Sequence, residues 1–310
     1  MPYYTFTIAK KSGGTRTITA PDPELKAKQK ELLKEMRRLP AFWVSKKAHG
    51  FARKRSILTN ARIHTGKKWI LNLDIKDFFP SITRSRTLGC YKLGGDLVLA
   101  FHNNSLPQGA PTSPFLSNIY MRDFDTTIAG LVRKYVSDDI EYTRYADDLT
   151  FSSNSYALEK VPLFVRTKLK MLDLELNNKK TRLAGPGQRQ EVTGLNINSG
   201  RPTIPKKYRR KVRAITHRVS VGWSITEKQK VKLLGMISHI SLCHPEEALK
   251  YKNILLQSDI KFVSDNTRKL HHVKKIRLNQ KANKTKHHTN PTSKPATPKP
   301  AVSRKIHKCA

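Results

Sequence analysis

Three aspartates at the ends of strand-like runs constrain this chain more than any other feature. The apolar run 69–73 ends in Asp74, and two further strand-like runs flank the pair Asp147-Asp148. The short interruption between those two runs predicts a β-hairpin that carries the aspartate pair at its tip. If the hairpin pairs with the apolar strand, three carboxylates converge at one edge of a sheet.

Carboxylates placed so closely predict a metal site. In a partly buried site they repel each other by several kcal/mol unless cations lie between them. Two Mg²⁺ ions held by such carboxylates would clamp the attacking and leaving oxygens of a phosphoryl transfer. A single aspartate would be interpreted more simply as a turn cap or as the partner of a lysine or arginine. The arrangement of all three favours two-metal chemistry.

The charge of the chain points to a polyanionic partner. The 310 residues contain 60 Lys+Arg against 23 Asp+Glu, a net charge of +37. Self-repulsion on this scale is tolerated mainly when nucleic acid neutralises it. Thirteen of the basic residues lie in 266–310, which has no acidic residue and four prolines. This composition predicts a disordered basic tail, and the remaining +24 makes the body of the chain basic in its own right.

The cysteines and the chain start limit the compartment. Cys90, Cys243 and Cys309 lie far apart, so neither a disulfide framework nor a CxxC metal spacing is present. The first residues lack a secretion signal, and no run of about 18 apolar residues occurs. We expect a protein of a reducing, cytoplasmic compartment that has no membrane partner.

Periodicity predicts a mixed α+β body followed by a helical C-terminal third. A Gly-Gly turn predicts a hairpin near the start, and the last third has apolar residues at helical spacing, with basic residues on the other faces of 206–219. The expected strands are 3–8, 15–18, 69–75, 140–145, 149–152 and 192–197, and the expected helices are 23–39, 114–135, 158–174, 206–219, 226–242 and 246–261.

Three segments resemble the catalytic boxes of reverse transcriptases, in their order along the chain. These are NLDIKDFFPS at 72–81, LPQGAPTSP at 106–114 and YADD at 145–148. Two further segments are similar to elements of bacterial retron reverse transcriptases, NARIH at 60–64 and VTG at 192–194. The resemblance covers about residues 3–262. It implies a right-hand polymerase fold, with fingers and palm in 1–200, an α-helical thumb in 201–265 and then the tail.

The resemblance also implies roles for single residues. Asp74, Asp147 and Asp148 would bind two Mg²⁺ ions with the Ile75 carbonyl. Phe79 would exclude a ribose 2′-OH, although it could pack in the core in place of Phe78. The residues implied for nucleotide binding are Arg16, Phe79, Gln108 and Gly109, with Lys10 and Lys11 as alternatives to Arg16. Those implied for primer and template are Tyr145, Lys207, Arg210 and Arg213, and those for RNA recognition are Asn60, Ala61, His64, Val192, Thr193 and Gly194.

The function implied by the resemblance is that of a retron enzyme. Such an enzyme copies a structured non-coding RNA into branched single-stranded DNA (msDNA) from dNTPs, priming from a guanosine 2′-OH, and takes part in antiphage defence with an effector protein. With no room expected for an RNase H domain, a host RNase H would remove the template from the RNA/DNA hybrid. The alternatives are a group II intron-like or diversity-generating reverse transcriptase and, from another class, a non-catalytic RNA-binding scaffold.

Overall fold

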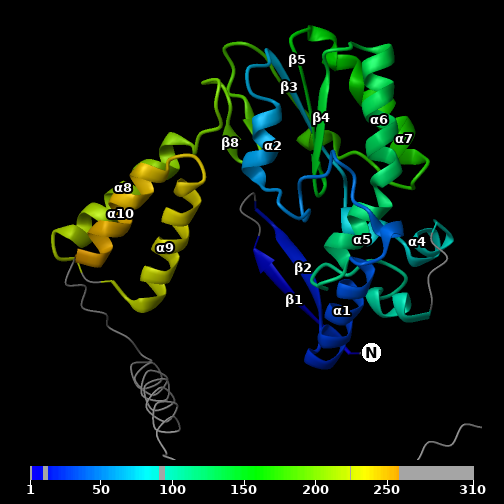
Figure 1. The fold of residues 1–310 in the computed structure, drawn as a ribbon, viewed down its shortest axis with the longest axis horizontal. Coiled ribbons are helices and arrows are strands. Elements are labelled where there is room, and N and C mark those ends of the chain that lie inside the picture. Colours follow the sequence, from blue (N-terminus) through cyan, green and yellow to red (C-terminus); the bar gives the residue numbers. More distant parts are fainter. Residues whose placement is uncertain (1, 10–12, 91–94, 224, 258–310) are drawn as a thin grey trace, which may run out of the picture.

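A computed structural model describes residues 2–9, 13–90, 95–223 and 225–257, and Figure 1 shows their arrangement. Lys10, Lys11 and the tail expected at 266–310 lie outside the described residues, as does the end of the helix expected at 246–261. The described chain mixes helices and strands, which confirms the α+β class.

A four-stranded antiparallel sheet, in the order β4-β5-β3-β6, forms the centre of the body. Its strands are β3 (Trp69–Asp74), β4 (Glu141–Tyr145), β5 (Asp148–Ser153) and β6 (Arg182–Ala184). The apolar strand β3 lies inside the sheet between β5 and β6, and Ile70, Leu71 and Leu73 are almost completely buried. The predicted hairpin and its pairing with the apolar strand are therefore confirmed.

Helices α5 (Ser113–Tyr120), α6 (Arg122–Tyr135) and α7 (Val161–Lys170) supply much of the core that packs against this sheet (Figure 1). The single helix expected at 114–135 is wrong, because the backbone leaves helical geometry at Met121, where ψ is 0°. The break lets the buried α5 and the amphipathic α6 pack in different directions. The helix expected at 158–174 was also too long. Its α-helical part begins at Val161 with Pro162 in the first turn, where a missing N–H costs nothing.

The N-terminal hairpin joins β1 (Tyr3–Ala9) to β2 (Thr15–Pro21), as the Gly-Gly turn predicted. Helix α1 (Pro23–Met36) follows, and the Asp22 side chain caps it by accepting a 2.8 Å hydrogen bond from the Leu25 N–H. The helix ends three residues earlier than expected, ahead of Pro40, because a proline disfavours helical geometry in the residue before it.

Several short elements were not predicted. They are strand β6 and the elements η1 (Pro40–Phe42), α2 (Ile57–Ile63), α3 (Phe78–Ser81), α4 (Arg84–Cys90), η2 (Gly95–Ala100), η3 (Tyr156–Lys160) and η4 (Asn178–Lys180). The strand expected at 192–197 is instead a tight hairpin of β7 (Glu191–Val192) and β8 (Leu195–Asn196). Thr193 and Gly194 form its turn with φ values of +47° and +82°, which reverses the chain.

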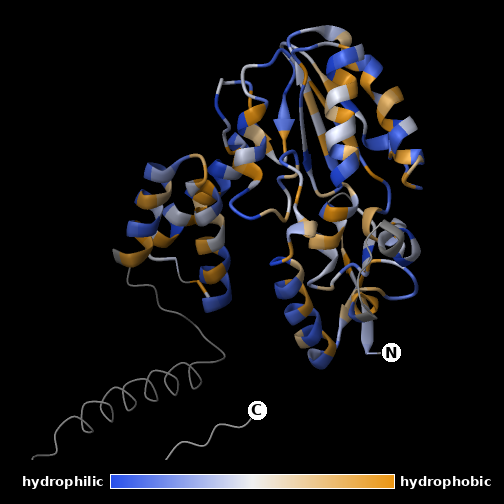
Figure 2. Ribbon diagram, turned by 45° about the vertical axis from the view of Figure 1, so that its right-hand side comes forward, coloured by the Kyte–Doolittle hydropathy of each residue, from blue (hydrophilic) through white to orange (hydrophobic). Residues whose placement is uncertain are grey.

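Helices α8 (Lys206–Ser220), α9 (Glu227–Ser241) and α10 (Pro245–Gln257) confirm the helical C-terminal third and are called the C-terminal helical module below. Figure 2 shows that these helices carry both hydrophobic and strongly hydrophilic faces. Their apolar residues share a core cluster with Val192 and Leu195 of the β7–β8 hairpin and Ala61 of α2. Within the described ranges, no helix has both the length and the apolar character that crossing a lipid bilayer requires.

Candidate active site

The edge of the central sheet brings the three predicted aspartates together. Asp74 ends β3 and is the register partner of Asp148, which begins β5. Asp147 lies in the two-residue turn between β4 and β5, and its carbonyl accepts a 3.0 Å hydrogen bond from the Ile75 N–H. The backbone of all three aspartates and of Ile75 is therefore held at one place by strand pairing.

Lys180 is part of this site, although the sequence did not single it out. Its Nζ lies 2.7 Å from Oδ2 of Asp74, whose residue is only 6% exposed. The chain reaches this position because the Asn177 N–H donates to the Asp74 carbonyl at 2.8 Å and Leu176 bridges to Ile75. One lysine among 60 basic residues gave no signal in the sequence, since its role depends on this long-range pairing.

The electrostatics of the turn reflect crowded negative charge. Burial away from water raises the pKa of Asp147, and the negative charge of Asp74 raises it further. The positive charges of Lys180 and Arg16 act against this rise. Asp148 keeps an exposed surface, yet the protein packed around its carboxylate and the charges of Asp147 and Asp74 raise its pKa to about 7. The pair therefore resists holding two negative charges without a compensating cation.

The donor set has the chemistry that a divalent metal ion requires. Carboxylate and carbonyl oxygens are the ligands that hard cations such as Mg²⁺ prefer. Among the residues that the structure describes, no three acidic, histidine or cysteine side chains converge tightly enough to coordinate one ion as they stand. Lys180 holds one oxygen of the Asp74 carboxylate, Oδ2, so in this state the lysine competes with a metal ion for that oxygen.

Aromatic rings lie beside the aspartates. Phe78 is buried in the core, whereas Phe79 is only partly buried. The Phe51 ring lies 6.2 Å from that of Phe79 and 6.5 Å from that of Tyr145, between centroids. Phe79 and Tyr145 thus face a common neighbour next to the aspartate turn, and Phe78 occupies the core position that Phe79 could have taken.

The LPQG segment contacts the N-terminal hairpin through its backbone. The Thr19 N–H donates to the Gln108 carbonyl at 2.9 Å. A Cβ atom at Gly109, where φ is +143°, would lie 2.8 Å from the Thr19 carbonyl oxygen, so this approach requires glycine. Arg16 lies three residues from Thr19 along β2 and is exposed, and its positive charge acts against the rise in the pKa of Asp147.

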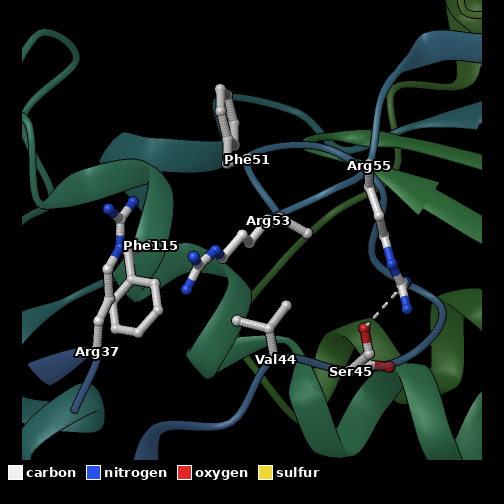
Figure 3. A pocket seen from close by; sticks show the side chains of 8 residues that line it. Arg37, Val44, Ser45, Phe51, Arg53, Arg55 and Phe115 are labelled. Atoms are coloured by element: carbon white, nitrogen blue, oxygen red, sulfur yellow. Dashed lines mark hydrogen bonds between the residues drawn. The ribbon is translucent and has the colours of Figure 1, made fainter.

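A basic cleft of about 640 Å³ opens next to this site (Figure 3). Arg37, Arg53 and Arg55 line it together with the rings of Phe51 and Phe115. The Arg55 guanidinium donates hydrogen bonds to the carbonyls of Ser45, Lys46 and Ala48. The cleft's exposed cations are therefore Arg37 and Arg53. Among the residues that the structure describes, those that line the cleft include no carboxylate.

The basic residues predicted on α8 are exposed. Lys207, Arg210 and Arg213 all reach solvent, and Arg210 and Arg213 line a second cleft with Lys206. Arg209, between them, is paired with Glu247 of α10 through its Nε at 2.7 Å. That ion pair holds α8 against α10 and leaves the neighbouring cations available to a ligand.

The two segments predicted for RNA recognition lie against each other, but most of their side chains are buried. Asn60, Ala61 and Val192 are fully enclosed, and the Asn60 Nδ2 lies 3.5 Å from Oγ1 of Thr193. His64 is also enclosed, with its ring nitrogens 2.7 Å from the hydroxyls of Ser152 and Thr143. Burial lowers the pKa of His64 to about 3. Of the six residues predicted for recognition, only Gly194 is exposed and Thr193 half-exposed, while Arg62 and Ile63, which lie within the first segment, are exposed as well.

The chain matches a known family over most of its length. The family described as "Reverse transcriptase (RNA-dependent DNA polymerase)" matches residues 8–238. The chain is 36% identical over 274 residues to the retron Mx65 reverse transcriptase of Myxococcus xanthus, which covers 79% of this chain and 62% of that protein. It is 34% identical to the retron Mx162 reverse transcriptase of the same organism, covering 78% of this chain and 58% of that protein.

A relative from Escherichia coli is matched over more of its own length. The retron Ec86 reverse transcriptase is 36% identical over 233 residues, which cover 72% of this chain and 71% of that protein. The chain thus spans about three fifths of the Myxococcus relatives and over two thirds of this one. The aspartates meet at one sheet edge, the family match covers residues 8–238, and the relatives are retron enzymes. The chain therefore belongs to the reverse transcriptase family, in its retron type.

Proposed function

We propose that this chain is the RNA-directed DNA polymerase of a retron, which copies a structured non-coding RNA into branched single-stranded DNA from dNTPs. The observation that carries the proposal is the register of β3 with β5, which places Asp74 opposite Asp148 and beside Asp147 in a chain of the retron type. Such a site needs no covalent protein intermediate, because positioning and electrostatics perform the transfer.

The aspartates and the Ile75 carbonyl would hold two Mg²⁺ ions. When bound, these ions supply charge that stabilises the attacking and leaving oxygens. The chain's own contribution is to fix the donors through the β3–β5 ladder and the bond from the Ile75 N–H to the Asp147 carbonyl. Lys180 would neutralise Asp74 until metal and nucleotide arrive, and then release it.

The incoming dNTP would bind between the N-terminal hairpin and the aspartate turn. Phe79 would lie against C2′ and exclude a ribose hydroxyl, which its partial burial beside the buried Phe78 allows. Gln108 and Gly109 would form the wall of the nucleotide pocket, where glycine lets the backbone approach closely. Arg16, whose charge already acts on Asp147, would contact the triphosphate.

The basic cleft would guide the template strand. The exposed cations Arg37 and Arg53 suit phosphates, and the exposed ring of Phe51 suits base stacking. Phe51 also lies next to Tyr145, which we place under the primer terminus. Template and primer strands would therefore meet at the aspartate turn.

The C-terminal helical module would act as the thumb. Lys207, Arg210 and Arg213 present positive charge on α8, which suits phosphate contacts along the RNA/DNA hybrid. The β7–β8 hairpin joins the same core cluster, so its exposed turn at Thr193 and Gly194 would lie beside the bound RNA. The buried Asn60, Ala61, His64 and Val192 would support recognition by holding that turn.

The wider setting follows from the proposed retron role. The protein would act in the bacterial cytoplasm, a host RNase H would remove the copied template, and an effector protein would link msDNA to antiphage defence. A group II intron-like or diversity-generating enzyme would also extend primers but would not leave branched RNA–DNA. Sequencing nucleic acid that copurifies with the protein separates these alternatives, because msDNA carries a 2′,5′ branch.

Primer extension on an RNA template with dNTPs and Mg²⁺ tests the polymerase itself. We expect extension by the wild-type protein and none by the variant Asp147→Asn with Asp148→Asn, whose RNA affinity and thermal stability stay close to wild type because a repulsive pair is removed. Extension by the purified double variant would contradict the metal assignment. A wild-type protein that binds RNA without extending it would favour the non-catalytic scaffold.

A further inference from the structure

The turn that carries Asp147 is strained. Two residues, Ala146 and Asp147, connect Tyr145 to its register partner Asp148. Ala146 has a φ of +58°, in the left-handed region that side chains rarely adopt and glycine favours. A non-glycine residue persists in this conformation only where its surroundings hold it.

A buried arginine near the end of β4 contacts the backbone of this turn. Arg144 is fully enclosed, and its Nη1 donates to the Ala146 carbonyl at 3.3 Å. Its Nε and Nη2 donate to the two carboxylate oxygens of Asp125 on α6, at 2.8 and 2.7 Å. Asp125 also accepts a 2.8 Å hydrogen bond from the Tyr142 hydroxyl. The guanidinium thus spans the distance from helix α6 to the catalytic turn.

A second series of contacts runs from Arg144 through Asn118 to Gly50, which packs against the turn. Nη1 of Arg144 also donates to Oδ1 of Asn118 on α5 at 3.0 Å, and the Asn118 Nδ2 donates to the Gly50 carbonyl at 2.9 Å. A Cβ atom at Gly50 would lie 2.6 Å from the Ala146 backbone nitrogen, so only glycine allows this contact. The peptide units on both sides of Ala146 are therefore enclosed.

We propose that Arg144, anchored by Asp125 and Asn118, is the positioning residue of the catalytic turn. By holding the Ala146 carbonyl, it fixes the peptide plane that leads into Asp147 and so the direction of both turn carboxylates. The inference rests on the proposed polymerase function for its kinetic consequence, but the restraint on the turn is a property of the chain alone. Within the described residues, the hydrogen bonds of this network reach the turn at its backbone and not at the side chains of Asp74, Asp147 or Asp148.

The identity of the residue supports this role. A planar guanidinium donates in several fixed directions at once, whereas a lysine ammonium is a single point and would not reach both Asp125 and the Ala146 carbonyl. Stability alone does not require such a pair. Replacing a buried ion pair by apolar residues of similar volume is often neutral or stabilising, while removing one partner leaves an uncompensated charge.

The test uses a variant that removes the whole network rather than one partner of it. In the triple variant Asp125→Leu, Tyr142→Phe, Arg144→Met, no buried charge is left unpaired. The matched control is Arg133→Met with Glu141→Gln, which removes the 2.7 Å ion pair between the same helix and strand, far from the turn. Measurements are thermal stability, RNA affinity, kcat and KM for dNTP addition, and amide hydrogen exchange in peptides covering 145–149.

We expect the triple variant to keep its thermal stability and RNA affinity, to lose about 100-fold in kcat with KM within about threefold, and to exchange its turn amides at least about tenfold faster. The control should match wild type throughout. A folded triple variant with wild-type kcat overturns the proposal. If the wild-type protein itself extends no primer, the proposed function fails, and the exchange data alone decide: unchanged protection at 145–149 overturns the restraint by Arg144. A triple variant that does not fold is replaced by Arg144→Lys, read by the same kinetics and exchange.

Discussion

His64 is expected to make the stability of this protein depend steeply on pH. Its ring is enclosed and lies 2.7 Å from both the Ser152 and the Thr143 hydroxyl, so it is held neutral and burial lowers its pKa to about 3. In the unfolded chain the same ring has a pKa near 6.5. Below pH 6.5 the unfolded state therefore binds a proton that the folded state excludes.

The sign and the size follow from this difference. Because the folded pKa is depressed, the contribution is fully present above about pH 6.5 and is lost as the pH falls toward 3. Between pH 7.5 and 5.0 the linkage amounts to about 2 kcal/mol of unfolding free energy for this one group. The folded pKa lies well below pH 5, so the ring in the folded state stays neutral over this range.

The perturbation is His64→Gln, which removes the titrating group. At pH 7.5 the variant loses about 2 kcal/mol or more of unfolding free energy, because its hydrogen bonds and packing are lost. Between pH 7.5 and 5.0, however, its unfolding free energy should fall by about 2 kcal/mol less than that of the wild-type protein. Urea unfolding at both pH values measures this, with the exposed His217→Gln on α8 as control. Equal pH dependence in wild type and His64→Gln would refute the reasoning. A selective loss of cognate RNA binding by the folded variant would support the indirect role in recognition proposed for His64.

Three further predictions concern the polymerase site and the tail. Phe79→Val should raise incorporation of rNTP relative to dNTP about tenfold or more, by kcat/KM, because it opens space beside C2′; an unchanged ratio in an active variant assigns Phe79 to the core. Lys180→Gln should tighten Mg²⁺ binding about fivefold in calorimetry without nucleotide, because the bond to Asp74 no longer competes; weaker binding would contradict this. Deleting 266–310, with its thirteen basic residues, should flatten the dependence of log K on log salt and keep the preference for cognate over scrambled RNA. Loss of that preference would make the tail the specificity element.

The catalytic edge could be predicted because its signals are local. An apolar run that ends in Asp74 and a short interruption before Asp148 define strands and a turn, and pairing then brings the carboxylates together. The boundaries of the long helices were less predictable. Met121 is apolar and fits a helical pattern, so the break there depends on tertiary packing that no local pattern reports.

Contacts between distant residues could not be predicted. Lys180 reaches Asp74 across 106 positions, and Arg144 meets Asp125 across 19, through side chains whose types are common in this chain. The burial of His64 has the same origin, since its hydroxyl partners lie 79 and 88 positions away. Sequence motifs identified these neighbourhoods, but the charges that balance them became visible only in the folded chain.

The close contact between Gly109 and Thr19 means that a small rotation of the N-terminal hairpin at this point moves its tip by a larger distance. The hairpin is attached to the LPQG segment near its base, whereas Arg16 lies three residues farther toward the tip, roughly 10 Å away along an extended strand. A rotation of the hairpin by about 10° about this contact therefore moves Arg16 by roughly 2 Å, which is more than half the length of a hydrogen bond. If Arg16 contacts the triphosphate as proposed, a small angular change at this contact would decide whether its side chain reaches the ligand. A side chain added at position 109 would press on the Thr19 carbonyl and change the angle of the hairpin.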